Sequence, residues 1–174
     1  VYAKSTLGIA PQMVGVYLTA RTGASIAFNL VWGHISDQRG NRALIRLTNT
    51  VGLCVPLLAL TIGLLHGLFP GGANWLAALY TLVFVASGAF GAGSGIGNMG
   101  YMLDIAPPAQ RTLYLGFTNT LFGVGLFTSS LGGLIVDWAG FNVLLVLSAG
   151  FFGLALLLSA LMVEPRKEDE HLAR

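Results

Sequence analysis

Charged side chains are scarce in this 174-residue sequence, since only 9% of its residues are Asp, Glu, Lys or Arg while 55% are hydrophobic. An average soluble domain carries about 25% charged and about 45–50% apolar residues. So few charges cannot cover the surface of a water-soluble globule, and the high hydrophobicity is opposite to that of a disordered chain. The composition excludes both classes and indicates a membrane protein.

Residues that carry metal or disulfide chemistry are also rare. The one cysteine, Cys54, excludes an intramolecular disulfide framework and is predicted to be a small core residue. His34, His66 and His171 lie far apart in the sequence without an acidic residue at ligand spacing, so we predict no metal site and no cofactor. The basic residues form no stripe with exposed aromatic residues, so no nucleic-acid partner is expected.

Long uncharged stretches dominate the chain, and about 20 helical residues suffice to cross about 30 Å of hydrocarbon. The stretch 47–103 is too long for one helix and is interrupted by the turn signal Pro70-Gly71-Gly72, so it contains two spans. The sequence predicts an all-α, polytopic membrane bundle over 1–163 with about five helices, followed by a charged cytoplasmic tail at 164–174. The predicted helices are 11–36, 43–68, 74–103, 112–136 and 140–163.

The basic residues also predict the orientation of the chain. Seven of the nine fall on one predicted side, which should be the cytoplasm because short cytoplasmic loops are enriched in Lys and Arg. We therefore expect a multi-pass protein of the cell membrane with a cytoplasmic C-terminus. The sequence begins with Val and opens without a secretory signal pattern, so we expect a fragment that begins within a longer protein.

Three of the predicted helices carry a polar face when residues are placed at 100° intervals, whereas the second and fifth do not. Polar groups in hydrocarbon are costly unless they meet partners or water, so these three helices should face an interior and the other two should face lipid. Hydrogen bonding between helices in a solid bundle remains the alternative. The predicted substrate-cavity residues are Arg21, Ser25, Asn29, Tyr80, Ser87, Ser94, Asn98 and Asn119.

Arg21 lies near the middle of the first predicted span, where an arginine costs at least about 2.5–3.5 kcal/mol. None of the five spans has an acidic residue at a similar depth. Its partner is therefore water, backbone carbonyls, an acidic residue outside this chain, or an anionic substrate group. Extension of the long side chain to the membrane surface is the alternative.

Glycine is abundant, with 24 residues, and it is concentrated in the third span. Gly91 and Gly95, like Gly93 and Gly97, have the spacing of small residues that let membrane helices approach closely. The sequence Gly95-x-Gly97-x-x-Gly100 formally matches a dinucleotide-binding pattern, but it lacks the preceding strand that this site requires. We therefore predict helix packing.

The most specific local pattern is the segment 33–42, between the first two spans. Gly33 permits close helix contact, Gly40 supplies a sharp turn, and Asp37 can cap a helix or pair with arginine. Arg39 and Arg42 set the orientation. We also predict that Asp37, Arg39 and Arg42 join the gating charge candidates Asp104 and Arg111 in a cluster that stabilises one access state. A role in orientation and solubility alone is the alternative.

This segment resembles the loop motif of the major facilitator superfamily, G-x-L-[SA]-D-R-x-G-R-[RK], through Gly33, Ser36, Asp37, Gly40 and Arg42. Gln38 and Asn41 replace positions that are frequently basic, as is common in the copy of the motif in the second half of these proteins. The segments 104–111 and 141–167 also look like the family's later loop and last helix. The resemblance implies the last five of twelve helices, in which the second and fifth spans are peripheral.

The resemblance further implies a secondary active transporter that moves a small solute by alternating access. Its implied partners are a small-molecule substrate, the lipid bilayer, and the N-terminal half of the same protein, with a coupling proton or ion left open. A membrane channel or a structural membrane subunit is the alternative. An intramembrane enzyme is less favoured, because the serine in Gly93-Ser94-Gly95 has no histidine base within predicted reach.

Overall fold

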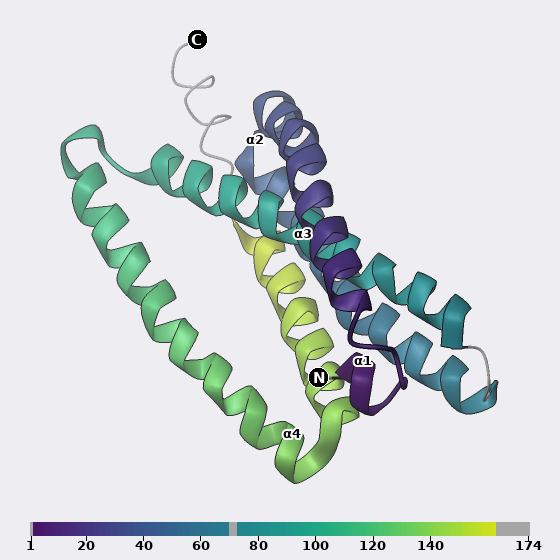
Figure 1. Cartoon of the computed structure of the whole chain (residues 1–174). Helices are drawn as coiled ribbons and strands as arrows, with labels where there is room; N and C mark the ends of the chain where they lie inside the picture. Colours follow the sequence, from purple (N-terminus) through teal and green to yellow (C-terminus); the bar gives the residue numbers. More distant parts are fainter. Residues whose placement is uncertain (1, 70–72, 163–174) are drawn as a thin grey trace.

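The computed structural model describes residues 2–69 and 73–162, and all regular structure in these two ranges is helical (Figure 1). The predicted all-α fold class is therefore confirmed. The predicted turn at 70–72 and the predicted tail at 164–174 lie outside the described residues. The elements in order are α1 Tyr2–Ser5, α2 Met13–Leu68, α3 Ala73–Ile105, the 3₁₀ helix η1 Pro108–Gln110, and α4 Arg111–Leu161.

Helices α2 and α4 are each bent sharply at a glycine. Gly40 has φ 81° and ψ 165°, and Gly140 has φ 82° and ψ 172°, a backbone conformation that glycine adopts without steric cost. Each helix therefore consists of two straight parts, called limbs below, and the two limbs of α4 are plainly separate in Figure 1. The limbs of α2 are residues 13–39 and 41–68, and those of α4 are 111–139 and 141–161. Gly40 thus makes the turn that the sequence predicts.

Among the described residues, three helical segments are long and apolar enough to cross a membrane, namely Met13–Leu68, Trp75–Ile105 and Leu131–Leu161. Because α2 bends at Gly40, each of its limbs is about 40 Å long at 1.5 Å per residue, which suffices for one crossing. The five crossings remain a prediction. The first helix continues from the predicted end at residue 36 to the bend, because the loop residues 37–39 are themselves helical.

Most of the buried core lies between α2 and α3. Its larger cluster is completed by α1 and the segment after it, since Tyr2, Leu7 and Ile9 are buried and the Tyr2 hydroxyl donates to the Ala59 carbonyl at 3.4 Å. A smaller cluster contains Trp32, Leu44 and Ala92. The first limb of α4 extends away from this core, as Figure 1 shows.

Glycines of α3 provide the close contacts with α2. A methyl group added at Gly88 would overlap the backbone carbonyl of Arg21, and one added at Gly93 would overlap the Thr48 side chain. A methyl group at Gly97 would lie 3.1 Å from Ile45 Cγ1. The predicted packing role is confirmed for Gly93 and Gly97.

The other predicted glycine pair, Gly91 and Gly95, makes no such close contact with α2. A methyl group added at Gly91 or Gly95 would have no heavy atom of the described chain within 4 Å. The packing prediction is therefore wrong for these two residues in this structure, because they lie on the face of α3 that α2 does not cover.

Candidate functional site

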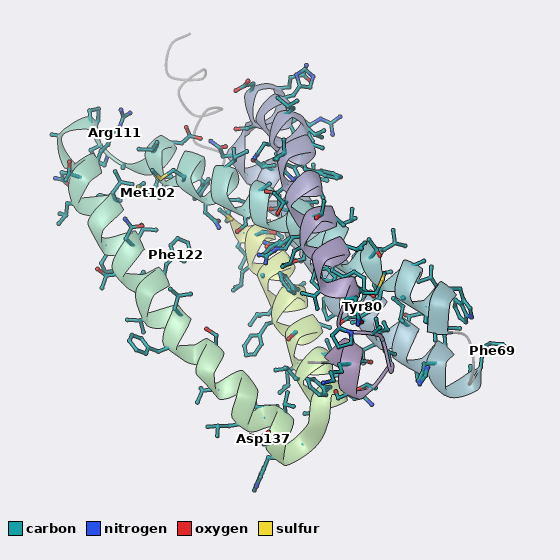
Figure 2. The ribbon with its side chains drawn as sticks, in the orientation of Figure 1. Phe69, Tyr80, Met102, Arg111, Phe122 and Asp137 are labelled. Atoms are coloured by element: carbon teal, nitrogen blue, oxygen red, sulfur yellow. The ribbon has the colours of Figure 1, made fainter. Side chains whose placement is uncertain are left out.

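A cavity of about 260 Å³ lies between α3 and the first limb of α4 and is called the α3–α4 cavity below. Figure 2 labels Met102 of α3 and Phe122 of α4, which line it from its two sides. The residues around it are Ser94, Gly95, Asn98, Met99, Met102, Leu115, Thr118, Asn119 and Phe122. Polar and apolar side chains are therefore combined in one lining.

The polar groups of the α3–α4 cavity are hydroxyls and amides. Asn98 Nδ2 donates a hydrogen bond to Ser94 Oγ at 3.0 Å, one helical turn away. This bond orients the Asn98 amide and leaves its carbonyl oxygen able to accept from another molecule. Thr118 and Asn119 face the same space from α4. Because the described residues of the lining include no ionisable side chain, its chemistry suits uncharged polar groups held against an apolar surface.

The structure brings three of the predicted substrate-cavity residues together, namely Ser94, Asn98 and Asn119. The other five lie elsewhere. Arg21 and Asn29 are exposed on the first limb of α2, and Ser25 and Ser87 are partly buried.

Tyr80 packs in an aromatic cluster with Tyr2, Tyr17 and Phe84, at ring-centroid distances of 6.1, 5.6 and 5.7 Å. The helical wheel assigned Tyr80 to the polar face of its helix by its hydroxyl, whereas its ring decides where it packs. Burial raises the pKa of the Tyr2 hydroxyl at the edge of this cluster.

Asn41, which stands at a frequently basic position of the loop motif, is buried. The Ser36 hydroxyl donates to Asn41 Oδ1 at 2.6 Å, and Asn41 Nδ2 donates to Asp104 Oδ2 at 2.7 Å. Asn41 is only 2% exposed, and a methyl group at Gly100 would collide with its side chain. These three hydrogen-bonded residues, the Asn41 cluster, connect the bend of α2 to the end of α3. The sequence feature that indicates this cluster is the amide residue Asn41 directly after the turn glycine Gly40.

The arginines after the bend hold the end of α4. Arg46 donates to the carbonyls of Ser159 and Ala160 at 3.1 and 3.0 Å, and Arg42 donates to the Ala160 carbonyl at 3.0 Å. The last carbonyls of a helix lack partners within it and carry partial negative charge, so they attract guanidinium groups.

The remaining motif residues are more exposed. Asp37 and Arg39 face solvent beside the bend, and Arg111 is exposed at the start of α4 (Figure 2). Gly33 has no heavy atom within 4 Å of a methyl position, so the close helix contact expected there is absent from the described part of the chain. The structure shows two contacts here, Asn41 with Asp104 and Arg42 with α4, and the cluster of gating charges stays a prediction.

Long apolar helices with hydroxyl and amide groups gathered around a cavity define a polytopic helical membrane protein. The whole chain, residues 1–174, matches the family described as Major Facilitator Superfamily. The chain therefore belongs to this family of membrane transporters, which are not enzymes.

One curated relative is the tetracycline resistance protein, class H, of Pasteurella multocida. It is 27% identical over 149 residues, which cover 79% of this chain and 34% of that protein. The chain thus spans about a third of the length of this relative. No solved structure matches the chain.

Proposed function

We propose that this chain forms part of the C-terminal half of a secondary active transporter that moves a small solute by alternating access. The observation that carries the proposal is the α3–α4 cavity, where Ser94, Asn98 and Asn119 converge between otherwise apolar helices. Polar groups at membrane depth are costly and typically mark a substrate or ion pathway. Membership of a transporter family supports the same reading.

Assignment to the C-terminal half rests on the segment 33–42, in which Gln38 and Asn41 replace basic residues of the loop motif. The N-terminal half of the same protein is then the partner that completes the pathway, and the bilayer surrounds both. A coupling proton or ion belongs to the same proposal.

Tetracycline is the first solute to test, because the relative is named for resistance to it. The longer protein that contains this chain should accumulate tetracycline in vesicles against its concentration gradient when an ion gradient is imposed. Asn98→Leu should lower the transport rate about tenfold, since the cavity loses its oriented amide. Thr120→Val, one position beyond the cavity residue Asn119, is the matched control and should transport normally. Flux that only equalises the concentrations would instead favour a channel.

Arg21 is proposed as a second polar position on the solute path. It is exposed on the first limb of α2, and its side chain makes no hydrogen bond or ion pair with the described residues. In the longer protein, Arg21→Lys should retain partial transport if only charge is required, and should lose it if a bidentate contact is required. Normal solute affinity and turnover in Arg21→Gln would remove this residue from the site.

The proposed orientation places the bend at Gly40 in the cytoplasm. Gln38 lies just before the bend and Phe69 directly follows the far end of the second limb of α2, so Gln38→Cys and Phe69→Cys, each in a Cys54→Ala background, should be labelled from opposite sides of the membrane. Labelling of both from the same side would contradict this orientation and the five crossings.

A further inference from the structure

A second cavity lies at the opposite end of the first limb of α2 from the bend and is called the aromatic cavity below. Its volume is about 380 Å³, within the range of small-molecule sites. It lies between three parts of the chain: α1 with the segment after it, the first turns of α2, and α3. Figure 2 shows Tyr80 of α3 beside α1 and the start of α2. None of the described residues that line it takes part in the α3–α4 cavity.

Three aromatic rings form one wall of this cavity. Tyr17 stacks on Phe84 with ring centroids 4.8 Å apart and an angle of 6° between the planes. Tyr80 meets both rings edge-on, at 5.6 Å from Tyr17 and 5.7 Å from Phe84. These interlocked rings make a rigid wall whose remaining faces and edges can accept another flat ring.

The hydroxyl of Tyr80 is the hydrogen-bond donor that this wall offers. The Tyr17 hydroxyl already donates to the Ala77 carbonyl at 3.1 Å. Tyr80 is only 8% exposed, yet its hydroxyl makes no hydrogen bond to the described residues. Its oxygen is not fully buried, so the hydroxyl is accessible and suited to donate to a bound molecule.

Lys4 provides positive charge at the rim of the aromatic cavity. It is exposed, lines the cavity, and makes no ion pair among the described residues. No acidic side chain from the described ranges lines the cavity, so none of them offsets the charge of Lys4 there. In the proposed five-span topology these residues lie near the ends of long apolar helices, at the depth where amphipathic molecules collect.

We propose that the aromatic cavity binds a planar aromatic anion. The ring system lies against Tyr17, Tyr80 and Phe84, the anionic group pairs with Lys4, and a polar oxygen of the ligand accepts from the Tyr80 hydroxyl. This site shares no lining residue with the α3–α4 cavity, and its test measures binding and does not depend on transport.

The probe is 6-hydroxy-2-naphthoate, which combines a flat ring system, a carboxylate and a hydroxyl oxygen. Its binding to the full chain in lipid nanodiscs is measured by equilibrium dialysis, with empty nanodiscs to subtract partition into lipid. We expect saturable binding that weakens about tenfold in Lys4→Gln and is retained in Lys4→Arg. The neutral 6-hydroxy-2-naphthamide should bind about tenfold more weakly than the acid to the unchanged chain.

Tyr80→Phe tests the hydroxyl without removing the ring. It should weaken 6-hydroxy-2-naphthoate about three- to tenfold and leave 2-naphthoate, which lacks the hydroxyl, unchanged. Tyr114→Phe is the matched control on α4 and should change neither affinity. Equal binding of the acid and the amide, or full affinity in Lys4→Gln, would overturn the proposal. Equal weakening of both acids in Tyr80→Phe would overturn the role of its hydroxyl.

Discussion

The contact between α2 and α3 and the first limb of α4 are both built from apolar residues interspersed with glycine, yet they differ in how those residues pack. Atoms of α2 lie within 3.1 Å of a methyl group placed at Gly88, Gly93 or Gly97. On the first limb of α4, by contrast, Gly116 and Gly125 have no heavy atom of the described chain within 4 Å of a methyl position. Large side chains there face outward too, with Phe127 80% and Trp138 97% exposed.

Apolar composition alone makes a helix able to cross a membrane, whereas packing between helices requires a matched surface on a neighbour. Lipid is as apolar as leucine, so burial of an apolar side chain between helices gains little by itself. Close approach at small residues and hydrogen bonds between helices supply the stability instead. Substitutions in α2 and α3 should therefore be costly where the equivalent ones in the first limb of α4 are not.

Of the variants considered, Gly88→Ala should lower the stability of the chain most. Its methyl group meets the backbone carbonyl of Arg21, which cannot move aside as the end of a side chain can. We expect the free energy of unfolding, measured by titration with sodium dodecyl sulfate, to fall by about 3 kcal/mol. The matched variant Gly125→Ala should be neutral or gain up to about 1 kcal/mol from helix propensity. Equal losses of unfolding free energy in both variants would contradict the proposed difference in packing between α3 and the first limb of α4.

Asn41→Ala should have the next largest effect. It removes the amide that Ser36 and Asp104 share and opens a space beside Gly100. We expect a loss of about 2 kcal/mol in the same titration, in keeping with loss of a buried polar partner. Gln38→Ala, exposed in the same segment, should change the stability by less than about 0.5 kcal/mol. If the two variants behave alike, the Asn41 cluster does not connect α2 to α3.

Arg46→Met should have the smallest of the three effects. It retains much of the aliphatic stem and removes the bonds to the carbonyls of Ser159 and Ala160. We expect about 1 kcal/mol of lost stability, since the pair is partly exposed and Arg42 still holds Ala160. A wider range of spin-label distances between α2 and the second limb of α4 should accompany the loss. Arg39→Met serves as the control, and a similar broadening there would contradict the specific role of Arg46.

The sequence predicted the fold because its signals are local. Apolar length predicts membrane helices, and Gly40 within a motif of charged residues predicts the sharp reversal. Helices 74–103 and 140–163 lie within two or three residues of the observed α3 and second limb of α4. These features depend on one segment of chain and its solvent.

The candidate site was predictable only in part, because a helical wheel shows which residues share a face and not which faces meet. It grouped Ser94 with Asn98 correctly, and both line the α3–α4 cavity. It could not show that Tyr80 lies away from this cavity, because the Tyr80 ring packs against rings from α1 and α2. Asn41 was missed for a similar reason, because its hydrogen-bond partner Asp104 is distant in the sequence.

If the α3–α4 cavity is part of a water-accessible solute path, as proposed, a charged thiol reagent should reach it, and this can be measured without knowledge of the solute. In the longer protein, Asn98→Cys should react with a membrane-impermeant methanethiosulfonate at least tenfold faster than Cys54. The native Cys54, predicted to be a core residue, is instead exposed on the second limb of α2, the helix predicted to contact lipid, and serves as the internal reference. Reaction of Asn98→Cys at the rate of Cys54 or slower would contradict the claim.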